Sequence, residues 1–589
     1  MVFAKLAKTA RVARVAVGDS SAVPALIFYD NMLHALAAAL AFQAPEHPPS
    51  IVTLIADNFG WNNVGYHNPS KEVVTPNIDG LLTSGVELTR HYVYRFCSPS
   101  RSSFQSGRIP LHVNDRNAEP TVSNPKDPVG GFAGIPVNMT GIAQKLKSVG
   151  YRTHMTGKWD AGMATPRHSP VGRGYDTWFG YYHHANDYWS EKLPFSATGN
   201  VDVCKNRFVD LWDTDKPAWG QSGTAYEEEL FINHTLATIA AHDAAAAPLF
   251  LVHAFHLVHT PLQVPTEWED KFRFIHDKGR RLYASMVAYM DDAIGKIVGA
   301  LRAKAGLWEN SLLLFTSDNG GPIYYPGSAN NHPLKGGKLS DWEGGVRVNA
   351  LLAGGALPLG ARGSTLDAPL HIADWYATFC ALAGCDGTTD AEAEAAGLPG
   401  VDSISMWPLL LAVDDGAHET TAQAAAQATA QQGLRTPQEQ ARAPRAQARS
   451  EVHLSNWALI QRVNSTGQLY KLLVGWQTGS GWVGDVYPNL TSVPPVPNPT
   501  AQYPPSKIDT WAYDCDGADG GACLYELVSD PTEHLNLAAA MPQRVQMMRA
   551  RLAELNTANY EPDRGKGDPQ SCVVAEGLYR GFYGPWIGV

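Results

Sequence analysis

A chain of 589 residues, of which 44% are hydrophobic and 10% aromatic, is long enough for one large domain and a smaller one. Lysine and arginine number 46 against 57 aspartates and glutamates, which gives a formal net charge of −11. This acidic balance argues against nucleic acid or an anionic membrane surface as the main partner, because phosphate binding requires a basic surface. A few cations at a local site could still hold an anion.

Residues 1–50 are interpreted as a targeting segment followed by a Pro-rich spacer. Four basic residues before any acidic one resemble a transit peptide, whereas the apolar run Met32–Ala41 ends in the Ala-x-Ala pattern of a secretory signal. We favour the secretory route and expect an extracellular or lysosome-like location. The apolar run is too short for a stable membrane span, and no later stretch is long enough for one.

Four short apolar runs, each followed by polar side chains, predict a parallel sheet in a large α/β domain over residues 51–415. The runs are Ile51–Ala56, Tyr151–Thr156, Leu249–Val252 and Leu312–Thr316. Helical patterns separate them: one is capped by Thr140 and ended by Gly150, and a longer one runs from about 281 to 305. Ligands gather at the carboxyl ends of strands in an open α/β sheet, so we expect the polar clusters to meet at one edge.

After this domain the composition changes twice. Residues 416–449 are rich in Ala, Gln, Thr and Arg, with almost no large apolar side chains, and are interpreted as a low-complexity surface insertion. Residues 450–589 contain strand patterns at Tyr470–Val474 and Leu524–Leu527 and an amphipathic helix beginning at Pro542. They are predicted to form a smaller α+β subdomain.

The cysteines and the glycosylation sequons fit a secretory protein. If Cys97 is set apart, six cysteines remain, an even number compatible with disulfides whose pairing the sequence does not give. Four Asn-x-Ser/Thr triplets are modest support for glycosylation. These sequons begin at Asn138, Asn233, Asn464 and Asn489.

The segment Cys97-Ser98-Pro99-Ser100-Arg101 carries the most specific motif of the chain. A lone cysteine in a turn set by proline is more often buried or disulfide-bonded than catalytic. Cys-x-Pro-Ser-Arg, however, closely resembles the signature of type I sulfatases, in which a formylglycine-generating enzyme oxidises the cysteine to formylglycine, the catalytic aldehyde. The resemblance runs nearly the length of the chain and is closest to the arylsulfatase B, or N-acetylgalactosamine-4-sulfatase, branch. Further segments that carry it are Val258–Pro265, Pro333–Arg347, Asp530–Glu533 and Gly584–Trp586.

The resemblance implies an alkaline-phosphatase-like α/β fold, in which helices flank a mixed, mainly parallel sheet and a smaller α+β subdomain follows. It also implies calcium-dependent hydrolysis of sulfate esters, on sulfated carbohydrates or aryl sulfates. The side chains implied to hold one Ca²⁺ are Asp57, Asn58, Asp318, Asn319 and modified Cys97. Each Asp-Asn pair could be an ordinary turn after a strand, but carboxylate and amide oxygens are also the ligands that Ca²⁺ prefers.

The same resemblance assigns roles to four cationic side chains. Arg101 would hold the formylglycine, and Lys158, His259 and Lys338 would contact the sulfate group. The lysines and the metal would offset negative charge on the sulfuryl oxygens, and His259 is the expected proton donor to the leaving alcohol. Taken singly, each Lys or Arg is more often a solvated surface charge.

Two residues depart from the pattern of the relatives. Asn58 stands where they usually have a second aspartate, and Asp160 follows Gly-Lys-Trp where they usually have a histidine. Our hypothesis is that Asp160 partly restores the lost charge, as the base for sulfate expulsion or as an outer-shell partner of the metal. Specificity is expected to lie in loops such as Arg116–Pro136 and His183–Tyr188.

Two other functions remain open at this stage. Sulfate and phosphate have similar shapes, so a phosphoester or phosphonate hydrolase of the same superfamily is one alternative. The departures at Asn58 and Asp160 motivate another, an inactive homologue that binds sulfated glycans.

Overall fold

The structure is a computed structural model that describes residues 47–589 apart from 71, 194–201, 325–326, 415–447 and 487–511. Residues Pro48–Val589 form one compact unit. The predicted targeting segment, almost all of the predicted insertion and the sequon at Asn489 lie outside the described residues. Within the described ranges, no helix is long and apolar enough to cross a bilayer.

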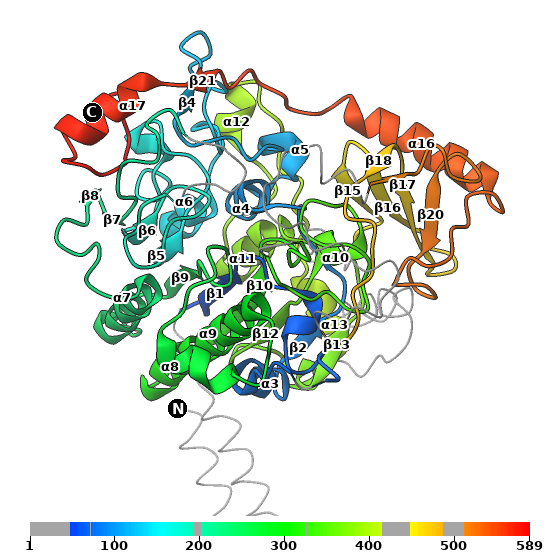
Figure 1. Ribbon diagram of the computed structural model, residues 1–589, viewed down its shortest axis with the longest axis horizontal. Helices are drawn as coiled ribbons and strands as arrows, with labels where there is room; N and C mark the ends of the chain where they lie inside the picture. The colour runs from blue at the N-terminus through cyan, green and yellow to red at the C-terminus, as the bar shows by residue number, and fades with distance from the viewer. Residues whose placement is uncertain (1–46, 71, 194–201, 325–326, 415–447, 487–511) are drawn as a thin grey trace, which may run out of the picture. The chain divides into compact units, whose positions relative to one another are not determined.

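A ten-stranded mixed sheet forms the centre of this unit (Figure 1), with the strand order β13-β2-β12-β10-β1-β9-β5-β6-β7-β8. The five central strands, from β10 to β6, run parallel, and antiparallel pairs occur toward both edges. The strands are β1 (Ser50–Ala56), β2 (Val86–Leu88), β5 (Arg152–Lys158), β6 (Thr177–Tyr181), β7 (Trp212–Asp213), β8 (Lys216–Pro217), β9 (Leu249–Ala254), β10 (Ser311–Ser317), β12 (Leu351–Ala353) and β13 (Ser364–Leu366). The four predicted runs correspond to β1, β5, β9 and β10.

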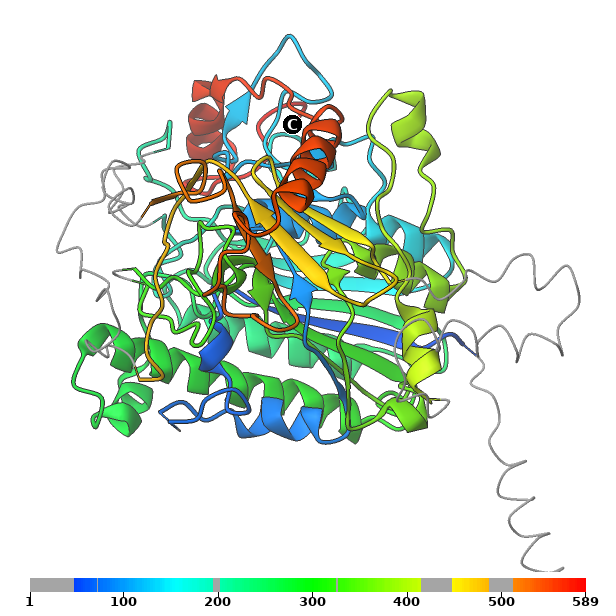
Figure 2. The ribbon, with the colours of Figure 1, turned by 90° about the vertical axis from the view of Figure 1, so that its right-hand side faces the viewer.

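Helices cover both faces of this sheet. Along β1, Ile51 and Ile55 enter one hydrophobic cluster while Val52 and Leu54 enter the other, as the alternation of side chains in a strand requires. The first face is covered by α4 (Cys97–Ser106), α6 (Ile142–Ser148) and α11 (Asp374–Ala383), and the second by α3 (Pro76–Leu82), α7 (Glu227–Ala241) and α9 (Lys278–Ala303). Figure 2 shows α9 lying along its side of the sheet. The predicted fold class is confirmed.

The two predicted helices are present, but one predicted cap is wrong. Helix α9 begins at Lys278, after the capping side chain of Asp277, and buries a stripe of Met and Leu side chains that includes Met286, Met290 and Leu301. In α6 the N-cap is Gly141 and not Thr140. The hydroxyl of Thr140 donates instead to Asp390 Oδ1 at 2.7 Å, because the fold brings that distant carboxylate within reach.

A four-stranded antiparallel sheet lies in the carboxyl-terminal part. It consists of β15 (Glu451–Ser455), β16 (Ala458–Arg462), β17 (Leu469–Leu473) and β20 (Cys523–Glu526). Helix α16 (Pro542–Asn556) packs on one face, and Trp342 and Val346 of the larger part pack on the other. Strands β17 and β20 and helix α16 match the elements expected from the sequence.

Short elements complete the described chain. They are η1 (Trp61–Asn63), β3 (His91–Tyr92), α5 (Pro110–Val113), β4 (Val122–Ser123), η2 (Pro166–His168), α8 (Thr266–Glu269), η3 (Asp270–Phe272), α10 (Glu343–Val346), β11 (Arg347–Val348), η4 (Leu359–Ala361), β14 (Leu370–His371), α12 (Ala391–Ala395), α13 (Trp407–Asp414), β18 (Trp476–Gln477), β19 (Tyr513–Asp514), β21 (Lys566–Gly567) and α17 (Pro569–Gly577).

Ionic and covalent links tie distant parts of the chain together. Lys471 Nζ of β17 lies 3.0 Å from Glu343 Oε1 and 2.9 Å from Glu533 Oε1, and all three side chains are fully buried. The expected disulfides are present: Cys204–Cys572, Cys380–Cys385 and Cys515–Cys523. Cys97 is free and buried.

Candidate active site

The parallel register brings the two Asp-Asn pairs together at the carboxyl ends of β1 and β10. Ala56 pairs with Ser317, so Asp57 and Asp318 follow neighbouring strands at the same level. The backbone N–H of Asn58 donates to Asp318 Oδ1 at 3.3 Å, and Asn319 Nδ2 donates to Asn58 Oδ1 at 2.8 Å. All four side chains are buried. The two predicted segments therefore form one cluster of carboxylate and amide oxygens.

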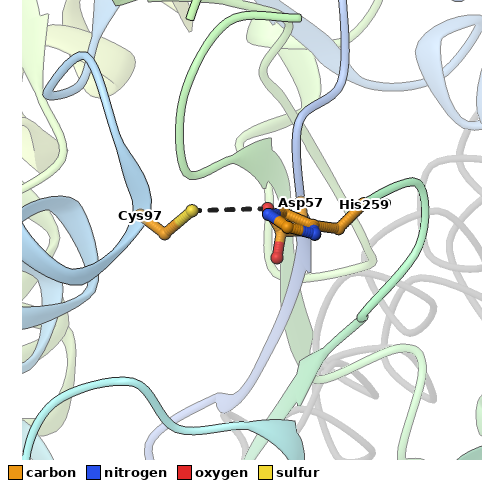
Figure 3. A group of neighbouring side chains, drawn as sticks. All are labelled: Asp57, Cys97 and His259. Carbon is orange, nitrogen blue, oxygen red and sulfur yellow. Dashed lines mark hydrogen bonds between the residues drawn. The ribbon is translucent and has the colours of Figure 1, made fainter. Parts of the chain in front are cut away.

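Cys97 is the first residue of α4 and points at this cluster (Figure 3). Its Sγ lies 3.6 Å from Asp57 Oδ1 and 3.3 Å from Asn319 Oδ1. Burial, reinforced by the negative charges of Asp318 and Asp57, raises the pKa of the Cys97 thiol to about 12. The thiol is therefore neutral at physiological pH, and a neutral thiol is a poor nucleophile.

Arg101 lies one helical turn after Cys97, on the same face of α4. Its guanidinium contacts Asp318 Oδ2 through Nε at 2.9 Å and Nη2 at 2.8 Å. Nη2 also lies 3.5 Å from Asp57 Oδ2, and Nη1 donates to the carbonyl of Lys158 at 3.1 Å. The motif Cys-x-Pro-Ser-Arg thus places its two reactive side chains against both Asp-Asn pairs.

Lys158 reaches the same cluster from the end of β5. Its Nζ lies 2.7 Å from Asp57 Oδ2 and 3.5 Å from Asp160 Oδ2. The preceding Gly157 has a φ of 92°, and a Cβ there would lie 1.9 Å from the carbonyl oxygen of Ala254 in β9, so only glycine fits. Burial by itself would raise the pKa of Asp57, but the charges of Lys158 and Arg101 outweigh it and hold that pKa below its ordinary value.

Lys338 and His259 complete the cluster and are partly exposed. Lys338 Nζ lies 2.7 Å from Asn58 Oδ1, 3.3 Å from Cys97 Sγ and 3.2 Å from His259 Nε2. His259 Nδ1 lies 2.6 Å from the carbonyl of Thr260, so Nδ1 carries the proton and Nε2 accepts from Lys338. Burial, followed by the charge of Lys338, lowers the pKa of His259 to about 3.

Asp160 lies beside Lys158 and has a further partner that the sequence did not indicate. Its Oδ1 accepts a hydrogen bond from His184 Nδ1 at 2.8 Å. Burial would raise the pKa of Asp160, but His184 and Lys158 hold it below its ordinary value. All predicted site residues are therefore brought together, and His184 joins them from a loop that was expected to set specificity.

The loop that bears His259 is held by two residues that sequence reasoning missed. Glu228 Oε1 accepts the backbone N–H groups of His256 and Leu257 at 2.7 and 3.0 Å. The Tyr188 hydroxyl lies 2.9 Å from the carbonyl of His256 and 3.0 Å from that of His259. In the sequence, Glu228 is one of three successive glutamates, and nothing in that run distinguishes it from its neighbours.

The arrangement has the properties of a site for an anionic ester. The Asp-Asn pairs supply oxygen ligands for a hard cation, and one ligand atom each of Asp57, Cys97 and His259 lies within 4.8 Å of the others. Arg101, Lys158 and Lys338 surround them with positive charge, which can hold a tetrahedral oxyanion. The fold and the site together define a hydrolase of esters of such anions.

Comparison with known proteins specifies the class further. A family model described as Sulfatase matches residues 49–385. The chain belongs to the sulfatase family, and so to the hydrolases of sulfuric esters. This confirms the family expected from the cysteine motif.

Two relatives illustrate how far the similarity extends. Arylsulfatase J of Mus musculus is 29% identical over 546 residues, which cover 91% of this chain and 80% of that protein. N-acetylgalactosamine-6-sulfatase of Sus scrofa is 28% identical over 398 residues, which cover 66% of this chain and 71% of that protein. The assignment to the arylsulfatase B branch stays a prediction.

Solved structures share the fold. The crystal structure described as Ps i-CgsB is 23% identical, with a TM-score of 0.61, and the match covers 91% of this chain and 98% of that one. The PsFucS1 sulfatase from Pseudoalteromonas sp. is 21% identical, with a TM-score of 0.60, and the match covers 88% and 92% of the two chains. The fold is therefore the alkaline-phosphatase-like fold of sulfatases.

Proposed function

We propose that this protein hydrolyses sulfate esters of sugars or polysaccharides with the help of Ca²⁺ and of a formylglycine made from Cys97. The observation that carries the proposal is the position of Cys97 Sγ, which lies 3.3 Å from both Asn319 Oδ1 and Lys338 Nζ. A neutral, buried thiol has little use there. An aldehyde at the same place, once hydrated, would supply an oxygen nucleophile for the sulfur atom and a second hydroxyl for the later release of sulfate.

The residues present fit a calcium ion. Asp57, Asn58, Asp318 and Asn319 offer only oxygen ligands, two of them carboxylates in adjacent buried positions. Burial and then the charge of Asp57 raise the pKa of Asp318, an unfavourable proximity that a divalent cation would relieve. When bound there, Ca²⁺ would polarise a sulfuryl oxygen and favour the deprotonated form of the nucleophile.

The cationic side chains would bind and orient the sulfate group. Arg101 would hold the modified side chain at position 97, and Lys158 and Lys338 would offset the charge on the sulfuryl oxygens. His259 Nε2 would pass a proton to the leaving alcohol, and Lys338 Nζ, 3.2 Å away, could supply that proton.

Asp160 remains a candidate base for sulfate expulsion or an outer-shell partner of the metal. Its Oδ2 lies 3.5 Å from Lys158 Nζ, beside the proposed anion site. We expect Asp160→Asn to lower turnover, calcium affinity or both, measured as kcat with a small aryl sulfate and by calcium titration. If neither changes, Asp160 has neither role.

The names of the comparison proteins support a sugar substrate. One relative is an N-acetylgalactosamine-6-sulfatase, and one similar structure is described as a complex with k-i-k-neocarrahexaose. Three disulfides and the exposed sequon residues Asn233 and Asn464 support passage through an oxidising secretory compartment, where a formylglycine-generating enzyme would act. An extracellular or lysosome-like destination is part of this proposal.

Two measurements on protein from a secretory host test the proposal. Mass spectrometry of the peptide containing position 97 should find the aldehyde, and an intact thiol would favour the inactive sulfated-glycan binder. Paired assays with 4-nitrophenyl sulfate and 4-nitrophenyl phosphate should favour the sulfate, and the reverse preference would favour the phosphoester hydrolase. Cys97→Ala is the matched control for both measurements. Chelation of calcium should lower the rate at which the wild-type enzyme hydrolyses 4-nitrophenyl sulfate.

A further inference from the structure

The steps proposed above do not use the hydrogen bond between Asp160 and His184. Asp160 Oδ2 faces Lys158 Nζ, whereas Oδ1 accepts from His184 Nδ1 at 2.8 Å. The carboxylate therefore fixes the orientation of the imidazole and leaves Nε2 on its far side. Asp160 itself adopts a φ of 50°, a left-handed conformation that Asp tolerates better than most residues, which turns its side chain into this position.

His184 Nε2 has no hydrogen-bond partner among the described residues, although the atom is shielded from solvent. His183 Nε2 also lacks a partner, but the His183 side chain is 2% exposed and pairs with Asp210 inside the fold, whereas the His184 side chain is 18% exposed. A polar atom that is desolvated without a partner is costly. His184 thus presents an unsatisfied group at the edge of the site.

The groups around His184 carry charges of both signs. Burial opposes a charge on the ring, but Asp160 and, less strongly, Glu119 raise the pKa of His184, while Lys158 opposes them. Glu119 belongs to the loop Arg116–Pro136, so a charge of that loop acts on His184, which lies in the other loop expected to set specificity. Two carboxylates beside the imidazole suit a neutral hydroxyl better than a second anion.

We propose that His184 is a specificity-determining residue, whose Nε2 hydrogen-bonds a hydroxyl of the sugar that carries the sulfate ester, with Asp160 as its positioning residue. This inference rests on the proposed function, because the sulfate has to be held by Lys158 for that hydroxyl to come within reach. A simple aryl sulfate lacks the hydroxyl. The contact therefore separates sulfated sugars from aryl sulfates bound in the same site.

The test compares one small substrate with sulfated oligosaccharides as competitors. In the full-length, mature enzyme, KM is measured for 4-nitrophenyl sulfate, and Ki is measured for oligosaccharides of chondroitin 4-sulfate, chondroitin 6-sulfate and carrageenan. The ratio of KM to Ki reports preference for the sugar. We expect His184→Ala to lower this ratio by about ten- to a hundredfold for the best competitor, the loss typical of one buried hydrogen bond.

Conservative variants and a matched histidine separate recognition from a structural role. His184→Gln, whose side-chain amide can also bond a hydroxyl, should recover part of the ratio. Asp160→Ala should lower the ratio, and the double variant should lower it no further than His184→Ala, because Asp160 acts on the sugar only through His184. His183→Ala is the control, and it should shift the thermal midpoint without a selective effect on the ratio.

Several outcomes would overturn the inference. An unchanged ratio in His184→Ala, or an equal loss of affinity for aryl sulfate and sugar, would mean that His184 does not bind the sugar. If no oligosaccharide competes in the wild type while 4-nitrophenyl sulfate is hydrolysed, the inference fails and the sulfatase activity stands. If 4-nitrophenyl sulfate is not hydrolysed and position 97 is a thiol, the proposed function itself fails.

Discussion

At the scale of single residues, the site depends on buried carboxylates and buried cations whose charges compensate one another. Asp57 and Asp318 lie side by side with no solvent exposure, and Arg101 and Lys158 are nearly as deeply buried. Removing one member of such a group leaves an uncompensated buried charge, which is far more costly than losing a contact at the surface. A substitution that leaves these charges in place avoids this cost.

Cys97→Ser is such a substitution. If position 97 acts as a hydrated aldehyde, a serine can still accept the sulfuryl group but lacks the second hydroxyl needed to release sulfate. We expect the variant to accumulate a stable sulfate ester on Ser after exposure to 4-nitrophenyl sulfate, with loss of turnover. Intact-protein mass spectrometry before and after exposure measures the mass added by the sulfate ester, and Cys97→Ala should gain no mass. A serine variant that turns over at the wild-type rate would contradict the mechanism.

Glu228 gives a prediction for pH dependence. Burial raises its pKa from 4.5 to about 8, so between these values the folded protein holds a proton that the unfolded chain releases. This contribution to stability is present below pH 4.5 and is lost as the pH rises through about 8. We expect Glu228→Gln, which keeps the acceptor for His256 and Leu257, to weaken the fall in urea midpoint between about pH 5 and about pH 8. An identical pH profile in the variant would contradict this.

At the scale of elements, strand register positions the site more than any loop does. The pairing of Ala56 with Ser317 places two Asp-Asn pairs at one level, and Gly157 lets β5 approach β9 closely enough for Lys158 to reach them. A shift of one residue in either pairing would turn these side chains to the other face of the sheet. The long helix α9 packs on the same strands and keeps them in place.

The start of α9 can be tested by its cap. Asp277 Oδ1 accepts the backbone N–H of Arg280 at 2.7 Å. Asp277→Ala leaves that donor without its partner and should lower the free energy of unfolding by about 1 kcal/mol. Asp277→Asn keeps an acceptor and should retain most of the stability. Urea unfolding of both variants measures the difference, and an equal loss in the two would mean that the cap bond is not the cause.

The sequence predicted the main elements and the meeting of the two Asp-Asn pairs, but it missed other partners, for a physical reason. Burial of a β-branched run or of a helical Met and Leu stripe is a local property, so β1, β10 and α9 could be recognised from their own residues. The choice of partner is not local. Thr140 donates to Asp390, 250 residues away, and does not cap α6 as predicted. The contact between Asp160 and His184, and the support of the His259 loop by Glu228, depend on the same kind of distant approach.

At the scale of the whole molecule, a buried ion triad joins the small antiparallel sheet to the larger part. Lys471 lies between Glu343 and Glu533 within 3.0 Å of each, and none of the three is exposed. Lys471→Met should therefore remove the cation between two buried carboxylates, with Arg347 Nη1, 3.7 Å from Glu343, as the remaining cation, and cost about 3–5 kcal/mol of stability. The triad, together with the packing of Trp342, makes the carboxyl-terminal sheet part of the same folding unit as the catalytic strands.

A surface pair on the same subdomain is the matched control for this prediction. Arg551 and Glu451 form a partly exposed ion pair at 2.6 Å, and Arg551→Met should cost only about 0–1 kcal/mol. Adding Glu343→Gln and Glu533→Gln to Lys471→Met should recover part of the loss, since the triad then carries no charge, while Arg347 loses its contact with the Glu343 carboxylate. The urea midpoint is the readout, and a loss of equal size in Lys471→Met and Arg551→Met would contradict the account.

The last residues of the chain belong structurally to its first half. β21 pairs with β4, Cys572 is bonded to Cys204, and the Trp212 indole donates to the carbonyl of Tyr583. The disulfide partners are 368 residues apart and Trp212 is 371 residues from Tyr583, so β7 gains this cover only after most of the described chain has been synthesised. Local folding of the first half therefore cannot complete this side of the sheet by itself.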